Sequence, residues 1–280
     1  MRSRSAKGCV DSLKERLDLI LVQRGLYPTR EKAKTAIMAG HIYVNKQISD
    51  KPGSPVDESA EIEIRHLGCP YVGRGGLKLK QAIEVFDLDL TGVVAADFGA
   101  STGGFTDCML QEGAKRVYAI DVGYGQLDYR LRNDDRVINR ERCNIRYMEP
   151  DAIPEPLDFI TVDVSFISLS LILPVVASVL RDGGNVVCLV KPQFEAGREL
   201  VGKHGLVKDP DVHIDVIRKV MSYGGDAGLR PVALSYSPIT GAKGNIEYLL
   251  LLHKESKDEA VEIPVDVVVA EAHSRLDRRG

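Results

Sequence analysis

The chain has 280 residues, of which 44% are hydrophobic and 28% charged, so it has the composition of a folded protein with room for two domains. No apolar run reaches the length of a membrane span, and the first residues lack the apolar segment of a secretory signal, which predicts a cytoplasmic protein without a membrane partner. The five cysteines are widely spaced and the six histidines form no metal-binding motif, so neither a disulfide framework nor a metal site is expected.

Charge is distributed unevenly along the chain. Residues 1–46 carry ten Lys or Arg against four Asp or Glu, a net charge of +6, and since the whole chain has a net charge of −3, the remainder has −9. Such asymmetry predicts a basic module that binds an anionic partner, joined to a less basic body.

The first sixty residues predict a small module of helices and strands. Residues 12–15 have capping-box spacing and precede a helical apolar stripe that stops at Gly25. A second helix is predicted over residues 29–40. Residues 41–46 then form a strand that enters an Asn-Lys turn, and residues 61–64 form an alternating strand.

From about residue 70 onward, apolar runs alternate with helical stretches, which predicts a doubly wound α/β fold with a seven-stranded sheet. The strands are expected near residues 93–98, 117–121, 136–139, 158–163, 185–190, 231–236 and 246–252. Ligands of open parallel sheets bind beyond the carboxyl ends of the strands. Polar residues at those ends are therefore the candidates for a functional site.

The first of these strands runs into a glycine-rich loop, Asp97-Phe-Gly-Ala-Ser-Thr-Gly-Gly-Phe105. Its glycines let the backbone approach a ligand, and the start of the next helix offers unpaired N–H groups. The next strand ends at Asp121, the placement expected for an acid that binds ribose hydroxyls. Since neither G-x-G-x-x-G nor a P-loop is complete, an adenosine-type cofactor is favoured over a dinucleotide or a nucleoside triphosphate.

This loop resembles the first motif of S-adenosylmethionine methyltransferases. The resemblance implies that S-adenosylmethionine is the cofactor, with its methionine part held by the acid and the glycines and its ribose by Asp121. The expected cofactor-binding residues are Asp97, Gly99, Ala100, Ser101, Gly103, Gly104, Phe105, Asp121 and Asn144. Asn144, after the third strand, is equally well explained as a turn asparagine.

Four ionisable residues stand near the predicted strand ends in the order Lys78, Asp163, Lys191 and Glu247. Each alone would be read as an exposed salt bridge. Together they resemble the Lys-Asp-Lys-Glu tetrad of FtsJ-like ribose 2′-O-methyltransferases. The family pattern favours Lys78 over the competing Lys80, and it implies an antiparallel last strand, which would bring Glu247 to the edge shared by the others.

The resemblance also implies a role for each tetrad residue. A ribose hydroxyl is a poor nucleophile at neutral pH, so a lysine whose proton affinity is lowered by a second lysine and by burial can accept its proton, and Lys191 is the candidate. Asp163 and Glu247 would orient the ammonium groups. Lys78 would hold the hydroxyl in line with the methyl group.

The basic module carries Arg16-Leu-Asp, Thr29-Arg-Glu-Lys-Ala-Lys34 and Val44-Asn-Lys46. Over residues 14–65 it resembles the alpha-L RNA-binding module of a small-subunit ribosomal protein, pseudouridine synthases and tyrosyl-tRNA synthetases. The resemblance implies contacts to RNA phosphates that read shape rather than bases. The expected RNA-binding residues are Arg16, Arg30, Lys34, Lys46 and, at the start of the second module, Arg74. Solvated helix-face charges are the alternative.

Taken together, residues 14–254 resemble the TlyA or hemolysin A family, whose members methylate ribosomal RNA. The implied function is S-adenosylmethionine-dependent methylation of the ribose 2′-hydroxyl of cytidine in ribosomal RNA, with ribosomal RNA or ribosomal subunits as partner. An RNA-binding protein with a degenerate methyltransferase fold is an alternative. A membrane-lytic hemolysin is disfavoured, because no long amphipathic or membrane-spanning segment is present.

The expected organisation places a basic extension in front of two domains. It consists of an extension (1–13), an alpha-L RNA-binding domain (14–65), a linker (66–73), an FtsJ-like methyltransferase domain (74–254) and a C-terminal tail (255–280). Within the methyltransferase domain, residues 197–208 contain several basic side chains. This segment is interpreted either as a solvated connector or as a loop that covers bound RNA.

Overall fold

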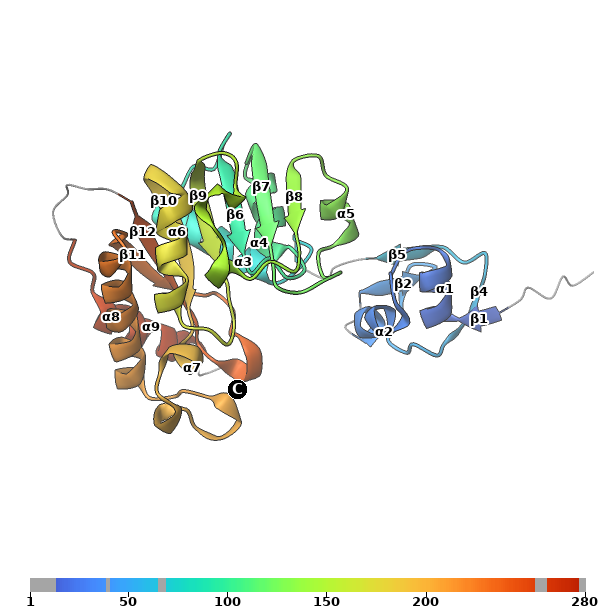
Figure 1. Ribbon diagram of the computed structural model, residues 1–280. Helices are drawn as coiled ribbons and strands as arrows, with labels where there is room; N and C mark the ends of the chain where they lie inside the picture. Colours follow the sequence, from blue (N-terminus) through green and yellow to red (C-terminus); the bar gives the residue numbers. More distant parts are fainter. Residues whose placement is uncertain (1–13, 39–40, 65–68, 255–260, 277–280) are drawn as a thin grey trace, which may run out of the picture. The chain divides into compact units, whose positions relative to one another are not determined.

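The computed structural model describes residues 14–38, 41–64, 69–254 and 261–276. The chain divides into two compact units, Met1–Pro70 and Tyr71–Gly280. The elements of both units are labelled in Figure 1.

Over its described residues, the N-terminal unit contains two short helices and five short strands. They are β1 (Lys14–Arg16), α1 (Leu17–Gln23), α2 (Arg30–Met38), β2 (Ile42–Val44), β3 (Gln47–Ile48), β4 (Pro55–Asp57) and β5 (Ile62–Ile64). β1 pairs with β4, and β2 lies between β3 and β5 in a second antiparallel sheet. Apolar side chains of both helices, Leu17 and Leu21 from α1 and Ala33 and Ile37 from α2, are fully buried and form the core with Ile42. The N-terminal unit therefore has its own small hydrophobic core.

The predicted capping box is wrong, whereas the predicted Asn-Lys turn is confirmed. Glu15 belongs to β1 and pairs with Val56, so the chain is extended up to Arg16 and the helix begins only at Leu17. The other end of the predicted box, residue 12, lies outside the described residues. At the turn, Asn45 and Lys46 both have positive φ values, 49° and 68°, as a two-residue hairpin loop requires.

The second unit contains one seven-stranded sheet, and all seven predicted strands are confirmed. The strands are β6 (Val94–Phe98), β7 (Arg116–Ile120), β8 (Val137–Arg140), β9 (Leu157–Val162), β10 (Leu180–Val190), β11 (Arg230–Tyr236) and β12 (Tyr248–His253). Their order across the sheet is β11-β12-β10-β9-β6-β7-β8, which can be followed in Figure 1. β12 runs antiparallel to both of its neighbours, β10 and β11, as the family resemblance implied, and the other neighbouring pairs are parallel.

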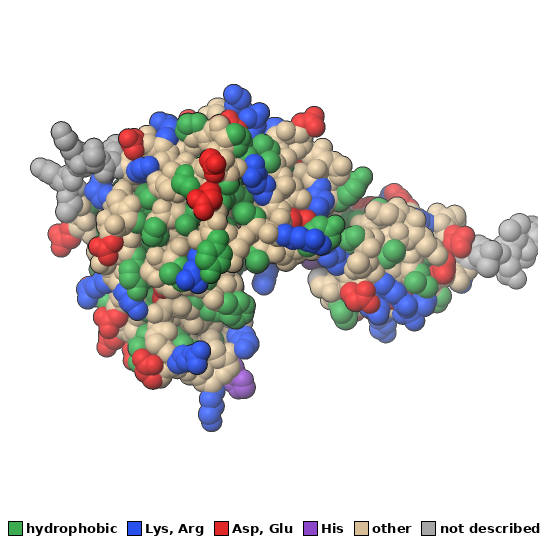
Figure 2. Space-filling model, viewed as in Figure 1, with side chains coloured by type: hydrophobic (Ala, Val, Ile, Leu, Met, Phe, Trp, Pro, Cys, Tyr) green, Lys and Arg blue, Asp and Glu red, His purple; other side chains and the backbone are tan. Residues whose placement is uncertain are grey.

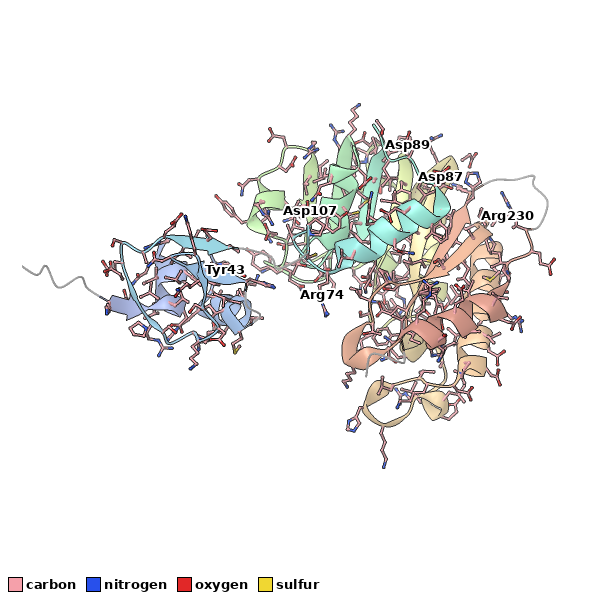
Figure 3. The ribbon with its side chains drawn as sticks, turned by 180° about the vertical axis from the view of Figure 1, so that it is seen from behind. Tyr43, Arg74, Asp87, Asp89, Asp107 and Arg230 are labelled. Atoms are coloured by element: carbon pink, nitrogen blue, oxygen red, sulfur yellow. The ribbon has the colours of Figure 1, made fainter. Side chains whose placement is uncertain are left out.

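Helices cover both faces of this sheet. They are α3 (Gly75–Phe86), α4 (Gly104–Gln111), α5 (Tyr129–Arg132), α6 (Leu173–Val179), α7 (Pro192–Glu195), α8 (Pro210–Asp226) and α9 (Val265–Leu276). Side chains from alternate strand positions, such as Phe98 and Tyr248, join the core that packs against α6, α8 and α9. Figure 3, which views the molecule from behind, shows α3 on the opposite face.

Two segments outside the predicted domain bounds of 74–254 pack against this unit. α9 contacts α8 and β11, so residues of the predicted tail complete one face of the sheet. Tyr71 is buried, and the backbone N–H of Val72 donates to the carboxylate of Asp107 on α4 at 2.7 Å, a residue labelled in Figure 3. Residues 71 and 72, part of the predicted linker, are therefore anchored to the second unit.

The register of the strands brings their ends to one edge. Phe98 at the end of β6 is level with Val162 at the end of β9, and Val190 at the end of β10 is level with Tyr248 at the start of β12. The residues that follow β6, β9 and β10 and the residue that precedes β12 therefore meet. This edge is where an open parallel sheet binds ligands.

Candidate active site

A cavity of about 380 Å³ opens at this edge of the sheet. It is lined by Arg74, Gly75, Lys78, Asp97, Gly99, Ala100, Ser101, Thr102, Gly104, Phe105, Asp163, Ser165, Phe166, Lys191, Gln193, Phe194, Ile239, Thr240, Gly241 and Glu247. All four residues of the predicted tetrad are among them, together with most of the predicted cofactor loop. Three cationic side chains face three carboxyl side chains, so the cavity is polar without a large excess of either charge.

The four tetrad side chains form a continuous chain of contacts. Lys78 Nζ lies 2.6 Å from Glu247 Oε2 and 3.7 Å from Asp163 Oδ2. The other carboxylate oxygen of Asp163 lies 2.5 Å from Lys191 Nζ. Both lysine side chains are about nine-tenths buried, with exposed fractions of 11% and 8%. Each charge is therefore compensated by an opposite charge in a largely dry setting, as buried ions require.

Lys191 has a complete set of hydrogen-bond acceptors. Besides Asp163, its ammonium group donates to the carbonyl oxygen of Val164 at 2.9 Å and to Ser165 Oγ at 3.1 Å. An ammonium group has three hydrogens and no acceptor. The position of Lys191 Nζ is thus fixed by three partners from the segment after β9.

Glu247 is brought into the site by the connection between β11 and β12. The backbone N–H of Ser237 donates to the carbonyl oxygen of Glu247 at 2.8 Å, which closes this connection into a loop. Gly241 leaves room for the Glu247 carboxylate, because a Cβ at position 241 would lie 2.0 Å from Glu247 Oε1. Any side chain there would displace the carboxylate that binds Lys78.

The glycine-rich loop is built around the buried carboxyl group of Asp97. One oxygen accepts from both the backbone N–H and the hydroxyl of Thr106 at the start of α4, and the other accepts from Thr161 Oγ1. Burial raises the pKa of Asp97 to about 7, against the opposing effect of these hydrogen bonds. Gly99 follows with φ +92°, and a Cβ there would lie 2.5 Å from the carbonyl oxygen of Asp163.

Asp121 lies beside the loop, but neither Asp121 nor Asn144 lines the cavity. The two carboxylate oxygens of Asp121 accept from the backbone N–H groups of Ser101 and Gly123 at 2.8 and 2.7 Å. The side chain of Asn144 accepts from the N–H of Arg146 and caps a short 3₁₀ helix. Gly103 lies at the start of α4, where a Cβ would clash with Leu131.

The predicted RNA-binding residues of the N-terminal unit include two that share one buried partner. Arg16 Nε and Arg30 Nε lie 3.0 and 2.8 Å from the two carboxylate oxygens of Asp18, whose side chain is fully buried. The hydrogen bond from Arg16 lowers the pKa of Asp18 to about 2. Lys46 is exposed at its hairpin turn, and Lys34 is half-buried on α2. The fifth residue, Arg74, lines the cavity and is labelled in Figure 3.

Several site residues did not emerge as candidates from the sequence. Ser165 fixes Lys191, and Phe166 and Phe194 form an aromatic pair at the cavity with ring centroids 4.8 Å apart. Their signal was adjacency, because they follow Asp163 and Lys191, the tetrad residues at the ends of β9 and β10. Ile239 and Thr240 carried no such signal.

Among the described residues, no group of three or more His, Cys, Asp or Glu side chains is arranged to hold a metal ion. Likewise, none of the described helices has the length and apolar character needed to cross a membrane.

Comparison with known proteins identifies both units. Residues 71–254 match the model of the FtsJ-like methyltransferase family, and residues 15–62 match the S4 domain. YqxC of Bacillus subtilis is 50% identical over 273 residues, which cover 96% of this chain and 97% of that protein. A solved structure from Streptococcus thermophilus has a TM-score of 0.76 at 46% identity and covers 96% of this chain and 98% of its own.

Two further relatives carry the names that the resemblance suggested. The 16S/23S rRNA (cytidine-2′-O)-methyltransferase TlyA of Mycobacterium tuberculosis is 40% identical over 242 residues, 86% of this chain and 90% of that protein. Hemolysin A of Brachyspira hyodysenteriae is 40% identical over 235 residues, 84% of this chain and 98% of that protein. The chain therefore belongs to the FtsJ-like methyltransferase family, in the group of TlyA and hemolysin A, with an S4 domain in front of the methyltransferase domain.

Proposed function

We propose that this protein transfers a methyl group from S-adenosylmethionine to the ribose 2′-hydroxyl of a cytidine in ribosomal RNA. The observation that carries the proposal is the contact chain Glu247–Lys78–Asp163–Lys191 in a cavity that also borders the glycine-rich loop. The choice of cytidine and of ribosomal RNA rests on the named activity of the TlyA relatives. Acting on ribosomal RNA would place the protein in the cytoplasm.

The residues at the glycine-rich loop fit S-adenosylmethionine. Gly99 lets the loop pack against the backbone of Asp163, which a Cβ would clash with, and Gly99, Ala100 and Ser101 all line the cavity. Each oxygen of Asp121 accepts one backbone hydrogen bond and keeps a lone pair for a ribose hydroxyl. The positive charge of a bound sulfonium would favour the ionised form of Asp97.

When bound, S-adenosylmethionine supplies an electrophilic methyl group on a sulfonium that is a good leaving group. The protein must then position the ribose oxygen and take up its proton. Lys78 suits positioning, because within the described chain its ammonium has one short hydrogen bond, to Glu247, and can donate to the ribose oxygen. Lys191 would take up the proton that the ribose hydroxyl loses on methylation.

Proton uptake requires Lys191 to be neutral at that moment. Its longest hydrogen bond, at 3.1 Å, joins it to Ser165 Oγ, and a hydroxyl can rotate from acceptor to donor. Loss to solvent of the proton that faces Ser165 would leave the contacts to Asp163 and Val164 in place and give Nζ a lone pair for the ribose proton. Asp163 stays between both lysines and stabilises the ammonium that forms.

The S4 domain supplies much of the RNA affinity in this proposal. Arg16 and Arg30 are held by Asp18 through one edge of each guanidinium, and both remain roughly half exposed, so their other N–H groups can reach phosphates. Such contacts orient the RNA without reading its bases.

The proposal is tested by incubating the protein with methyl-labelled S-adenosylmethionine and unmethylated small subunits, large subunits or free ribosomal RNA. The RNA is then digested to nucleosides and analysed by mass spectrometry. We expect the label in 2′-O-methylcytidine from at least one substrate. Label in a methylated base, or no label in any RNA, would overturn the proposal.

A further inference from the structure

Two short glycine-bounded turns lie side by side next to the cavity. The first is Gly-Lys-His-Gly at residues 202–205, in the loop after α7, and the second is Gly-Ala-Lys-Gly at residues 241–244, between β11 and β12. In both, the backbone N–H of the fourth residue donates to the carbonyl oxygen of the first, at 3.1 and 3.2 Å. In both, the third residue has a left-handed φ, 68° for His204 and 60° for Lys243.

The two turns are tied together by one buried side chain. Asn245 donates to the carbonyl oxygen of Gly205 at 2.9 Å, accepts from the N–H of Val207 at 3.2 Å, and accepts from the N–H of Gly241 through its own backbone carbonyl at 2.8 Å. A Cβ at position 205 would lie 3.9 Å from Lys243 Nζ. The first turn is therefore fixed against the second rather than free to move.

A second buried group secures the same loop from the other side. His213 of α8 is fully buried, and its Nε2 lies 3.0 Å from the carbonyl oxygen of Val207, to which it must donate. Its other nitrogen lies 2.7 Å from the hydroxyl of Tyr248, the residue after Glu247. Buried polar contacts thus connect the loop after α7 to β12, the strand that follows Glu247.

The tips of both turns carry exposed positive charge. Lys203, His204 and Lys243 are all exposed, and none of them makes an ion pair or a side-chain hydrogen bond with the residues that the structure describes. Figure 2 shows Lys and Arg side chains and a histidine gathered at this end of the unit, below α7. Unpaired lysines held at fixed positions in strained turns suggest an anionic ligand, since backbone strain of this kind is concentrated at functional sites.

We propose that the paired turns, residues 202–205 and 241–244, clamp the phosphate backbone of the RNA substrate next to the nucleotide that enters the cavity. Gly241 lines the cavity itself, so phosphates bound at the turns would belong to nucleotides adjacent to the reacting ribose. Glycine-bounded four-residue loops also hold nucleic-acid backbones in an unrelated RNA-binding fold. This inference rests on the proposed function, because it assumes that the substrate is RNA.

The test compares three double variants of the full-length protein: Lys203→Ala with Lys243→Ala, Lys203→Arg with Lys243→Arg, and a control, Lys115→Ala with Lys219→Ala, which removes two exposed lysines elsewhere on the unit. Binding to free unmethylated ribosomal RNA is measured without cofactor over a range of salt concentrations. Steady-state methylation of the same RNA and calorimetric affinity for S-adenosylmethionine are measured in parallel.

The alanine pair should lower RNA affinity and raise KM for RNA on the order of tenfold, and should reduce the slope of log affinity against log salt by about 2. kcat and cofactor affinity should stay near the wild-type values, and the arginine pair and the control should bind like wild type. An unchanged salt slope in the alanine pair would overturn the clamp, and so would an equal defect in the arginine pair, which would indicate a structural role. Absence of methyl transfer by wild type would instead count against the proposed function, and the binding data would still decide the clamp.

Discussion

The two units each place an acid between two cations, and they differ in how far the cations are buried. In the N-terminal unit, Asp18 joins Arg16 and Arg30, whose side chains are 48% and 41% exposed. In the catalytic unit, Asp163 joins Lys78 and Lys191, which are almost covered. A buried acid that orients exposed guanidinium groups prepares a surface for binding an anion. A covered acid between two amines instead holds groups that can donate and accept protons.

This comparison teaches that a charge pattern alone does not assign a role. Arginine stays charged and presents several donors, so exposed arginines suit phosphate contacts. Lysine can lose its proton when it is desolvated, so buried lysines suit chemistry. Variants that alter one unit should therefore change binding, and variants that alter the other should change the rate of methyl transfer.

A loss of activity second only to that of Lys191→Ala is expected from Lys78→Met. It removes the cation between Glu247 and Asp163 and the donor that positions the ribose oxygen, so methyl transfer should fall by about 10²–10⁴-fold. The matched control is Lys80→Met on the same helix, where Lys80 pairs with Glu112 at a partly exposed site. Single-turnover methylation measures both, with thermal unfolding to verify that each variant is folded. Activity of Lys78→Met within a few-fold of wild type would remove Lys78 from the mechanism.

A smaller and different defect is expected from Asp121→Ala, because this acid faces backbone N–H groups rather than cations. Loss of its carboxylate removes an acceptor for the cofactor ribose and frees the Ser101 N–H, so affinity for S-adenosylmethionine should fall by about 10- to 100-fold. Calorimetry measures the affinity, and Asp135→Ala, at an exposed acid, is the control. Wild-type cofactor affinity in Asp121→Ala would separate this residue from the cofactor site.

On the binding side, changing Arg30 and Lys34 together to Ala should weaken RNA binding by about tenfold and reduce its salt slope by about 2, since each change removes a phosphate contact. The rate of methyl transfer at saturating RNA should not change. Titrations of free ribosomal RNA at several salt concentrations measure the slope, with Lys51→Ala as the control at an exposed lysine. A slope equal to that of wild type would make both side chains ordinary surface charges.

The smallest effect concerns the pH dependence of the N-terminal unit. Because the pKa of Asp18 is lowered from 3.8 to about 2 in the folded chain, its stabilising contribution is complete above about pH 4 and is lost as the pH falls toward 2. Hydrogen exchange in α1 and α2 of the full chain, corrected for intrinsic rates, should therefore show weaker protection over this range. Asp18→Asn should flatten that dependence. An equally steep pH dependence of protection in Asp18→Asn would mean that other carboxyl groups cause it.

Much of the catalytic unit could be predicted because its signals are local. Each strand is a short apolar run, and the ionisable residue that ends it is visible in the sequence, which was enough to bring Asp163 and Lys191 to one edge. Glu247 joined them only through the antiparallel direction of β12. The direction of β12 came from the family resemblance and not from the run itself.

Other features depend on contacts between distant segments, and local patterns do not report them. β1 exists because Lys14 pairs with Asp57, and this pairing overrides the capping-box spacing at residues 12–15. The close packing of the Glu247 carboxylate against the backbone of Gly241 is likewise invisible in a local sequence pattern. The contact of Asp18 with Arg30 joins residues twelve positions apart on two helices, so the motif Arg16-Leu-Asp did not show that its acid also orients Arg30.

The most direct test of the account is a single-turnover reaction of Lys191→Ala at saturating S-adenosylmethionine and RNA, with the products analysed as nucleosides. Lys191 Nζ lies 2.5 Å from Asp163 in the cavity and contacts no residue of the predicted cofactor loop through a hydrogen bond in the described chain. The account predicts cofactor and RNA affinities close to those of wild type, with 2′-O-methylcytidine formed by wild type and absent from the variant. Substantial formation of 2′-O-methylcytidine by Lys191→Ala would contradict it.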